Sequence, residues 1–238
     1  MLAAAAVCPC PPLLVPEVAA GAAPELDAAR AACADSLGLL AASRPDLLVV
    51  VGPVDEAGPT RYRQGTPGSF RGFGVDREVT LGRPEPDTAG QDVLPPSLAV
   101  AGWLLERAGW ADAPIEGLGV GEPLAAERCI HIGNEIAARA ERVALLVMGD
   151  ASACRTVKAP GYLDERAEPF DAEAARALGA ADLTALKGLD TGLAHELKVS
   201  GRAPWQVLAG AAEGAALQGT LLYEDAPYGV GYLVAAWS

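Results

Sequence analysis

Cys8 and Cys10, separated by one proline, are two side chains near the start of the chain that could perform chemistry together. Thiols at positions i and i+2 of an extended segment point the same way, so the pair could hold a soft metal or take part in redox chemistry. The pattern lacks the helix start that lowers the pKa of a thiol in a Cys-x-x-Cys motif. We therefore favour a second interpretation, in which both thiols are small buried apolar side chains.

Histidine, the commonest acid–base and metal-binding side chain, occurs only at positions 131 and 195. Both positions fall on predicted helices, 123–140 and 183–199, and neither neighbours a strand end, where α/β sheets usually place their sites. We predict that His131 and His195 lie at the surface or at helix ends. The sequence thus argues against a Ser-His-Asp triad and against a histidine-rich metal site.

Three glycines at alternate positions, Gly117, Gly119 and Gly121, precede a predicted helix and allow a nucleotide-binding interpretation. The dinucleotide fingerprint needs its third glycine one residue later, after a completed strand, so that the backbone can meet a pyrophosphate at the helix N-terminus. Here the three glycines fall inside a predicted strand that precedes the helix, and not in a turn after it. We prefer an ordinary strand-to-helix turn, and a nucleotide-binding module at Gly117–Gly121 stays open as an alternative function.

Unbroken apolar runs at 46–53 and 142–150 predict two strands. Runs without alternation are typical of strands covered on both faces, as in a largely parallel sheet. Helical periodicity precedes each run, over 24–42 and 123–140, and residues 1–8 predict a buried first strand. This repeated order predicts an α/β fold with a mostly parallel central sheet flanked by helices.

The remaining segments complete one predicted domain, 1–238, without an internal repeat or a linker. A long segment rich in Gly, Pro, Thr and Arg, 52–92, contains a predicted hairpin at 70–81, and loops of this length are often functional. Further helices are predicted at 95–109, 171–180, 183–199 and 204–215. Two strands, 220–224 and 228–237, predict an antiparallel C-terminal hairpin that closes the sheet.

Charge and cysteine usage narrow the possible partners. The chain has 18 Lys and Arg against 31 Asp and Glu, a net charge of −13. A phosphate backbone would be repelled, so we expect no nucleic-acid partner. No apolar run is long enough to cross a bilayer, and five cysteines without an export signal are typical of free thiols in a cytoplasmic protein. We expect no membrane association and leave a homo-oligomer open.

Four segments carry, in the same order, a resemblance to a known family. They are 8–18 (CPCPPLLVPEV), 49–54 (VVVGPV), 149–153 (GDASA) and 223–232 (YEDAPYGVGY). They resemble the P-H-P-P-L-L-x-P-E, S-P-H, G-D-x-S-H and Y-E-x-P-x-G-V-G-Y motifs of the LigB/MEMO superfamily, which contains the class III extradiol ring-cleavage dioxygenases and proteins like them. Residues 161–162 and 170–171 also keep that family's spacing.

The resemblance implies a metal site that this chain does not keep. In ring-cleaving members, two histidines and a glutamate hold Fe(II), and a third histidine is the acid–base group. The matching positions here are Cys10 and Val54 for the two ligands, Ala153 for the acid–base group, and Glu224, which alone is retained. Valine and alanine offer no lone pair, and a soft thiolate does not favour oxygen-activating Fe(II). We predict a cleft without ring-cleaving activity and without a cofactor.

Neighbouring residues leave open an enzyme of altered chemistry that uses Zn or Fe(II). Its candidate side chains are Asp150 and Ser152 at the end of the 142–150 strand, Asp55 after Val54, and Cys154 after Ala153. If Cys10, Cys154, Asp55 and Glu224 converge, they offer two sulfurs and two oxygens, a set that zinc accepts. Cys10 would then be a ligand or nucleophile, and Glu224 a ligand or general base. The preferred prediction is an emptied cleft that binds an unknown small molecule or protein.

Overall fold

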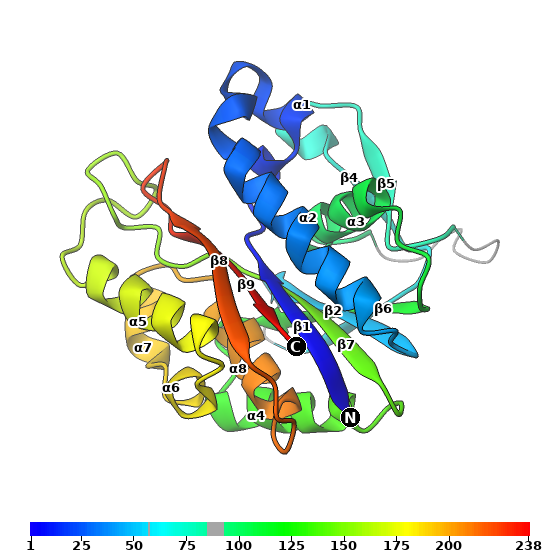
Figure 1. Cartoon of the computed structure of the whole chain (residues 1–238). Helices are drawn as coiled ribbons and strands as arrows, with labels where there is room; N and C mark the ends of the chain where they lie inside the picture. Colours follow the sequence, from blue (N-terminus) through cyan, green and yellow to red (C-terminus); the bar gives the residue numbers. More distant parts are fainter. Residues whose placement is uncertain (57, 85–92) are drawn as a thin grey trace.

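The computed structural model describes residues 1–56, 58–84 and 93–238, which fold around a seven-stranded sheet (Figure 1). The strands are β1 (Leu2–Cys8), β2 (Leu47–Val54), β3 (Thr60–Arg63), β6 (Ile115–Gly121), β7 (Val143–Met148), β8 (Gly219–Asp225) and β9 (Tyr232–Trp237). They lie in the order β3-β6-β2-β7-β1-β9-β8. The four strands from β6 to β1 are parallel, while β3 pairs antiparallel with β6, and β9 pairs antiparallel with β1 and β8. The predicted α/β fold and its C-terminal hairpin are confirmed.

Side chains of the central strands enter two separate apolar cores. In β2, Val49 and Val51 face one core, Leu48 and Val50 face the other, and all four are buried. β1 and β7 divide their side chains in the same way. Because both faces of the sheet are covered, every position of these strands is apolar, which explains the unbroken runs in the sequence.

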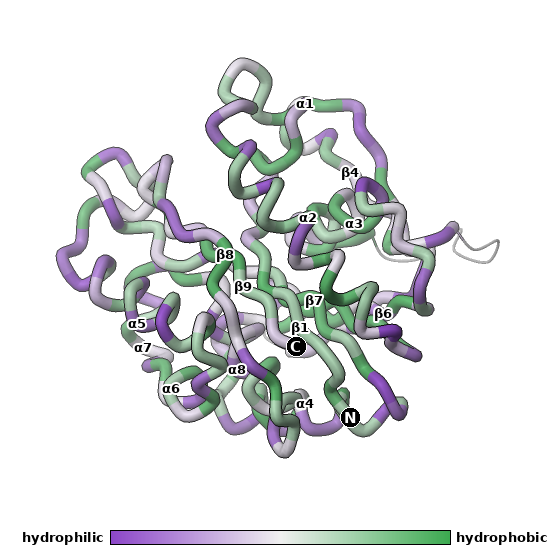
Figure 2. Tube along the Cα trace, viewed as in Figure 1, coloured by the Kyte–Doolittle hydropathy of each residue, from purple (hydrophilic) through white to green (hydrophobic). Residues whose placement is uncertain are grey.

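Helices form a layer on each face of the sheet (Figure 1). One layer contains α2 (Asp27–Ala42) and α3 (Pro96–Ala108) together with the short turns η1 (Pro12–Leu14), α1 (Pro16–Ala19) and η2 (Ala20–Leu26). The other contains α4 (Ala126–Ala137), α5 (Ala167–Gly179), α6 (Leu183–Lys187), α7 (Thr191–Glu196) and α8 (Arg202–Ala211). Polar residues gather mainly on the outer helices and loops, and apolar residues on the strands (Figure 2). Within the described ranges, no helix is long and apolar enough to cross a membrane.

The bounds of several predicted helices differ from those observed, and two of the differences have a local explanation. Pro24 lies in the 3₁₀ turn η2, so α2 begins at Asp27 and not at Pro24. The single helix predicted over 183–199 is two helices, because Gly188 ends α6 and Asp190 starts α7. The Asp190 carboxylate accepts a 2.6 Å hydrogen bond from Leu193 N–H, a capping bond that starts a new helix.

The segment 52–92 is more structured than predicted. It contributes the edge strand β3, which was not predicted, and a small two-stranded sheet of β4 (Pro67–Ser69) and β5 (Glu78–Thr80) joined through η3 (Arg71–Phe73). This sheet confirms the hairpin near 70–81, with its first strand slightly earlier than expected. Positions 57 and 85–92 of the segment lie outside the described residues.

Parallel strands place the loops after β1, β2, β6 and β7 at one edge of the sheet, and the chain termini lie together at the other edge (Figure 1). The segment before α8 packs directly against the end of β7. A Cβ atom on Gly149 would lie 2.4 Å from Gly201 Cα, so only glycine allows this approach. The approach brings Ser200 to the carboxyl edge of the sheet.

Candidate functional site

Cys10 and Asp150 meet at the carboxyl edge, directly after the neighbouring strands β1 and β7. The Cys10 N–H donates a 2.8 Å hydrogen bond to Asp150 Oδ1, and the Asp150 N–H donates a 2.9 Å bond to Ser200 Oγ. Three segments far apart in the sequence are thereby held together. We take Cys10, Asp150 and Ser200, with Tyr232 described below, as the carboxyl-edge site.

Asp150 remains partly exposed while protein surrounds most of its carboxyl group. Burial raises the pKa of Asp150 from the usual 3.8 to about 7, and the hydrogen bond from Cys10 N–H offsets only part of this increase. Within the described part of the chain, no basic side chain forms an ion pair with it. Asp150 is therefore a carboxyl group that can gain or lose its proton near neutral pH.

Cys10 carries a neutral thiol. Burial raises its pKa well above the usual value, and the negative charge of Asp150 raises the pKa further. A hydrogen bond with Ser200 lowers the pKa without cancelling these effects. Since the thiolate is the nucleophile and the metal ligand, a protonated thiol argues against either role for Cys10. All five cysteines are free, as the sequence predicted, and all five are buried, as predicted for Cys8 and Cys10.

Tyr232, the first residue of β9, adds a phenol to this site. Its side chain is 2% exposed. Burial raises the pKa of Tyr232 far above its usual value, and the nearby negative charge of Asp150 acts in the same direction. Among the described residues, its hydroxyl has no hydrogen-bond partner. A phenol hydroxyl that makes no described hydrogen bond leaves one donor and one acceptor for a ligand.

Ser152, another predicted cleft residue, has a structural role. Its N–H and Oγ donate 2.8 Å bonds to the two carboxylate oxygens of the buried Asp171, which also accepts a 3.1 Å bond from Arg155. The Ser152 carbonyl accepts a 2.8 Å bond from Gly231 N–H. These bonds attach the loop after β7 to α5 and to the approach of β9, and they use both hydrogen-bond donors of Ser152.

Val54 and Ala153, the other two positions at which the resemblance implies a histidine, are packed against neighbouring residues. Val54 is 8% exposed and lies so close to Gly119 that a Cβ there would be 2.4 Å from Val54 Cγ1. Ala153 is 9% exposed, and its N–H donates to the Leu197 carbonyl, as does the Cys154 thiol at 3.4 Å. Neither side chain can act as the histidine that the resemblance implies at its position, because valine and alanine carry no polar group.

The structure does not bring the four zinc candidates together in one set. Asp55 and Glu224 are exposed, whereas Cys10 and Cys154 are buried. Over the described ranges, no group of three or more His, Cys, Asp or Glu side chains could hold a metal ion. Glu224 lies on the edge strand β8, where its side chain faces solvent. The motif match identified this residue but could not show the direction of its side chain.

The three glycines of the nucleotide alternative lie in a strand and not at a helix start. Gly117, Gly119 and Gly121 all lie in the buried strand β6, and α4 begins only at Ala126. A Cβ on Gly117 would be 2.8 Å from the Leu81 side chain. These glycines make room for side chains of neighbouring segments and do not form a phosphate-binding loop at a helix start.

Sequence reasoning missed a second polar cluster at the same edge, after β6. Arg202 is fully buried and donates a 3.2 Å bond to Glu122 Oε2, while Ala203 N–H donates to Glu122 Oε1 at 3.3 Å. Burial raises the pKa of Glu122; Arg202, and to a smaller extent His195, oppose the increase. The available signal was an acidic residue directly after a predicted strand.

Both histidines are exposed, as predicted, and His131 pairs with Glu135 at 3.2 Å.

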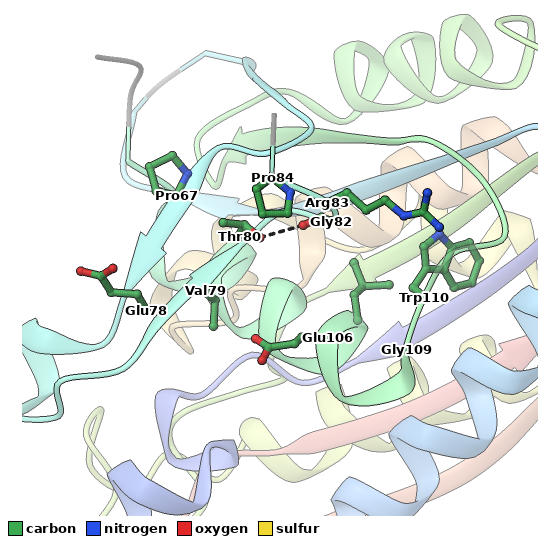
Figure 3. A pocket seen from close by; sticks show the side chains of 11 residues that line it. Pro67, Glu78, Val79, Thr80, Gly82, Arg83, Pro84, Glu106, Gly109 and Trp110 are labelled. Carbon is green, nitrogen blue, oxygen red and sulfur yellow. Dashed lines mark hydrogen bonds between the residues drawn. The ribbon is translucent and has the colours of Figure 1, made fainter. Parts of the chain in front are cut away.

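A hollow of about 570 Å³ lies away from this edge, between β5 and the end of α3 (Figure 3). Val79, Leu105 and Trp110 give it an apolar lining. Its two carboxylates are already paired, Glu78 with Arg71 and Glu106 with Arg77. None of the residues predicted from the sequence lines this hollow.

Comparison with known proteins supports the fold and no more. No family model and no curated protein matches the chain. Among solved structures, it is similar to the uncharacterized protein JW3007 from Escherichia coli K12, with a TM-score of 0.60 and 15% sequence identity. The match covers 98% of this chain and 98% of that chain. The likeness shows a shared fold.

Proposed function

We propose that this chain is a divergent LigB/MEMO-like protein that does not cleave aromatic rings and uses the carboxyl-edge site to bind a small molecule or a protein. The observation that carries the proposal is the contact between Cys10 and Asp150. It joins two of the motifs on which the family resemblance rests, 8–18 and 149–153, at the edge where α/β sheets place their ligands.

The side chains around that contact support binding more than oxygen chemistry. Val54 and Ala153 offer no metal ligand, Glu224 faces solvent, and Cys10 keeps its proton. The site instead offers a carboxyl group, a phenol and a hydroxyl, which can donate and accept hydrogen bonds without a metal. These groups fix the orientation of a ligand, which is what a binding site requires.

Metal analysis and a catechol assay on the same preparation test the proposal. We expect protein purified without added metal to contain far less than one iron per chain, and to leave catechol and protocatechuate intact after Fe(II) is added anaerobically. Glu224→Gln is the matched variant, because Glu224 is the one retained family ligand. We expect it to bind the same trace of metal as the parent protein. Stoichiometric iron together with ring opening would refute the proposal.

A further inference from the structure

Asp150 differs from the other two enclosed carboxylates at this end of the molecule. Asp171 has Arg155 at 3.1 Å, and Glu122 has Arg202 at 3.2 Å. Asp150 receives one backbone N–H and, within the described chain, no cation. An enclosed carboxylate without a positive partner is unfavourable in the free protein, and local costs of this kind concentrate at functional sites.

Among the described residues, the groups around Asp150 are hydroxyls or weak acids without a positive charge. β1 contributes Cys10, β9 contributes Tyr232, and the segment before α8 contributes Ser200. None brings a positive charge that would attract an anion. A carboxylate or phosphate ligand would be repelled by ionised Asp150, and none of these groups supplies a compensating positive charge.

We infer that the carboxyl-edge site binds the ammonium group of a small organic cation, with Asp150 as the anionic anchor. This inference rests on the proposed function and names the ligand class for the same site. An ammonium group has three donors. Asp150 Oδ2 and Tyr232 Oη are oxygen acceptors that no described hydrogen bond of this site occupies. The ligand supplies the positive charge that the described residues do not place beside Asp150.

The Cys10 amide provides a direct reporter, because it donates to the same carboxylate. We would titrate ¹⁵N-labelled full-length protein with n-butylammonium, and in parallel with 1-butanol and butyrate, which share the alkyl chain. We expect n-butylammonium to shift the Cys10 amide resonance in a saturable way, and the two controls to leave it unchanged. Asp150→Asn keeps the acceptor for Cys10 N–H and should weaken the ammonium affinity roughly 10- to 100-fold.

Tyr232→Phe is the second variant and keeps the test decisive if Asp150→Asn does not fold. It removes only the hydroxyl and should weaken n-butylammonium binding by a smaller factor, about 3- to 10-fold. Equal shifts with 1-butanol and n-butylammonium would overturn the cation inference and leave the proposed binding function standing. A saturable shift that Asp150→Asn and Tyr232→Phe leave unaltered, or no shift with n-butylammonium, would also overturn it. Iron-dependent ring opening would instead remove the proposed function itself.

Discussion

The 2.8 Å hydrogen bond from Cys10 N–H to Asp150 Oδ1 joins residues 140 positions apart, at the ends of two neighbouring parallel strands. The Asp150 N–H continues the connection to Ser200 Oγ. Three loops thus converge on one carboxyl group that lacks a charged partner in the described structure. The raised pKa of this carboxyl group makes the stability of the protein depend on pH.

Replacement of Asp150 by asparagine should stabilise the free protein at neutral pH. The folded state holds the Asp150 proton up to about pH 7, whereas the unfolded chain loses it near 3.8. The folded state therefore binds more protons between these values, and its stability falls as pH rises from about 4 to 7. Asp150→Asn removes this decline, so its advantage over the parent should grow over that interval to about 1–4 kcal/mol and then stay constant. Urea unfolding of both proteins at several pH values measures this difference in unfolding free energy.

Asp55→Asn is the control for this effect, because Asp55 is an exposed carboxylate at the same edge. Its stability should stay within about 0.5 kcal/mol of the parent at every pH. An Asp150→Asn protein that is less stable than the parent at neutral pH would show that the charge of Asp150 supports the fold, contrary to our argument.

Loss of the Arg202 guanidinium should be among the most damaging single changes at this edge. Its Nη1 donates to the Leu124 carbonyl at 2.7 Å and to Gln206 Oε1 at 2.9 Å, while Nη2 pairs with Glu122. Arg202→Met leaves Glu122 enclosed without a cation, at a cost of about 3–5 kcal/mol in unfolding free energy. In the double variant, Glu122→Gln removes the carboxylate that Arg202→Met leaves without a cation, so part of the lost unfolding free energy should be recovered. The effects of the two substitutions are then not additive.

The exposed Arg128 provides a matched arginine-to-methionine control, with an expected change within about 0.5 kcal/mol. Thermal unfolding of the four proteins compares them directly. If Arg202→Met and Arg128→Met cost the same, the buried ion pair contributes nothing to stability.

Cys10 and the other thiols should resist modification until the protein unfolds. Burial raises the pKa of the Cys10 thiol well above its usual value, and Cys8, Cys33, Cys129 and Cys154 are buried as well. At pH 8, we expect Ellman's reagent to titrate fewer than one thiol per folded chain, and all five in strong denaturant. Ser238→Cys, at the exposed last residue, should react at once and serves as the control. Rapid loss of the Cys10 thiol in the parent would restore its role as a nucleophile.

The sequence predicted the parts of this molecule that depend on periodicity. The apolar runs that became β2 and β7 required covering helices on both faces, and that requirement leads to the observed layers. The position of Ser200 was not predictable, because it depends on the close approach of Gly149 to Gly201 across the fold. For the same reason, motif matching identified Glu224 without showing that β8 turns its side chain to solvent.

The packing of α4 against α8 gives the sharpest stability prediction. A Cβ on Gly133 would lie 2.0 Å from the Val207 carbonyl oxygen, and a Cβ on Gly210 would lie 2.1 Å from the Ile130 carbonyl oxygen. The two backbones are therefore in direct contact, and neither carbonyl can move aside like a flexible side chain. Gly133→Ala should push the helices apart and lower the unfolding free energy by about 1–3 kcal/mol or more.

Gly38→Ala is its matched control in α2, where a Cβ would meet nothing within 4 Å. That change should instead raise stability by about 0.5–1 kcal/mol, because alanine favours the helix. Urea unfolding of both variants at one pH measures the contrast, and two changes of the same sign would contradict the contact between α4 and α8.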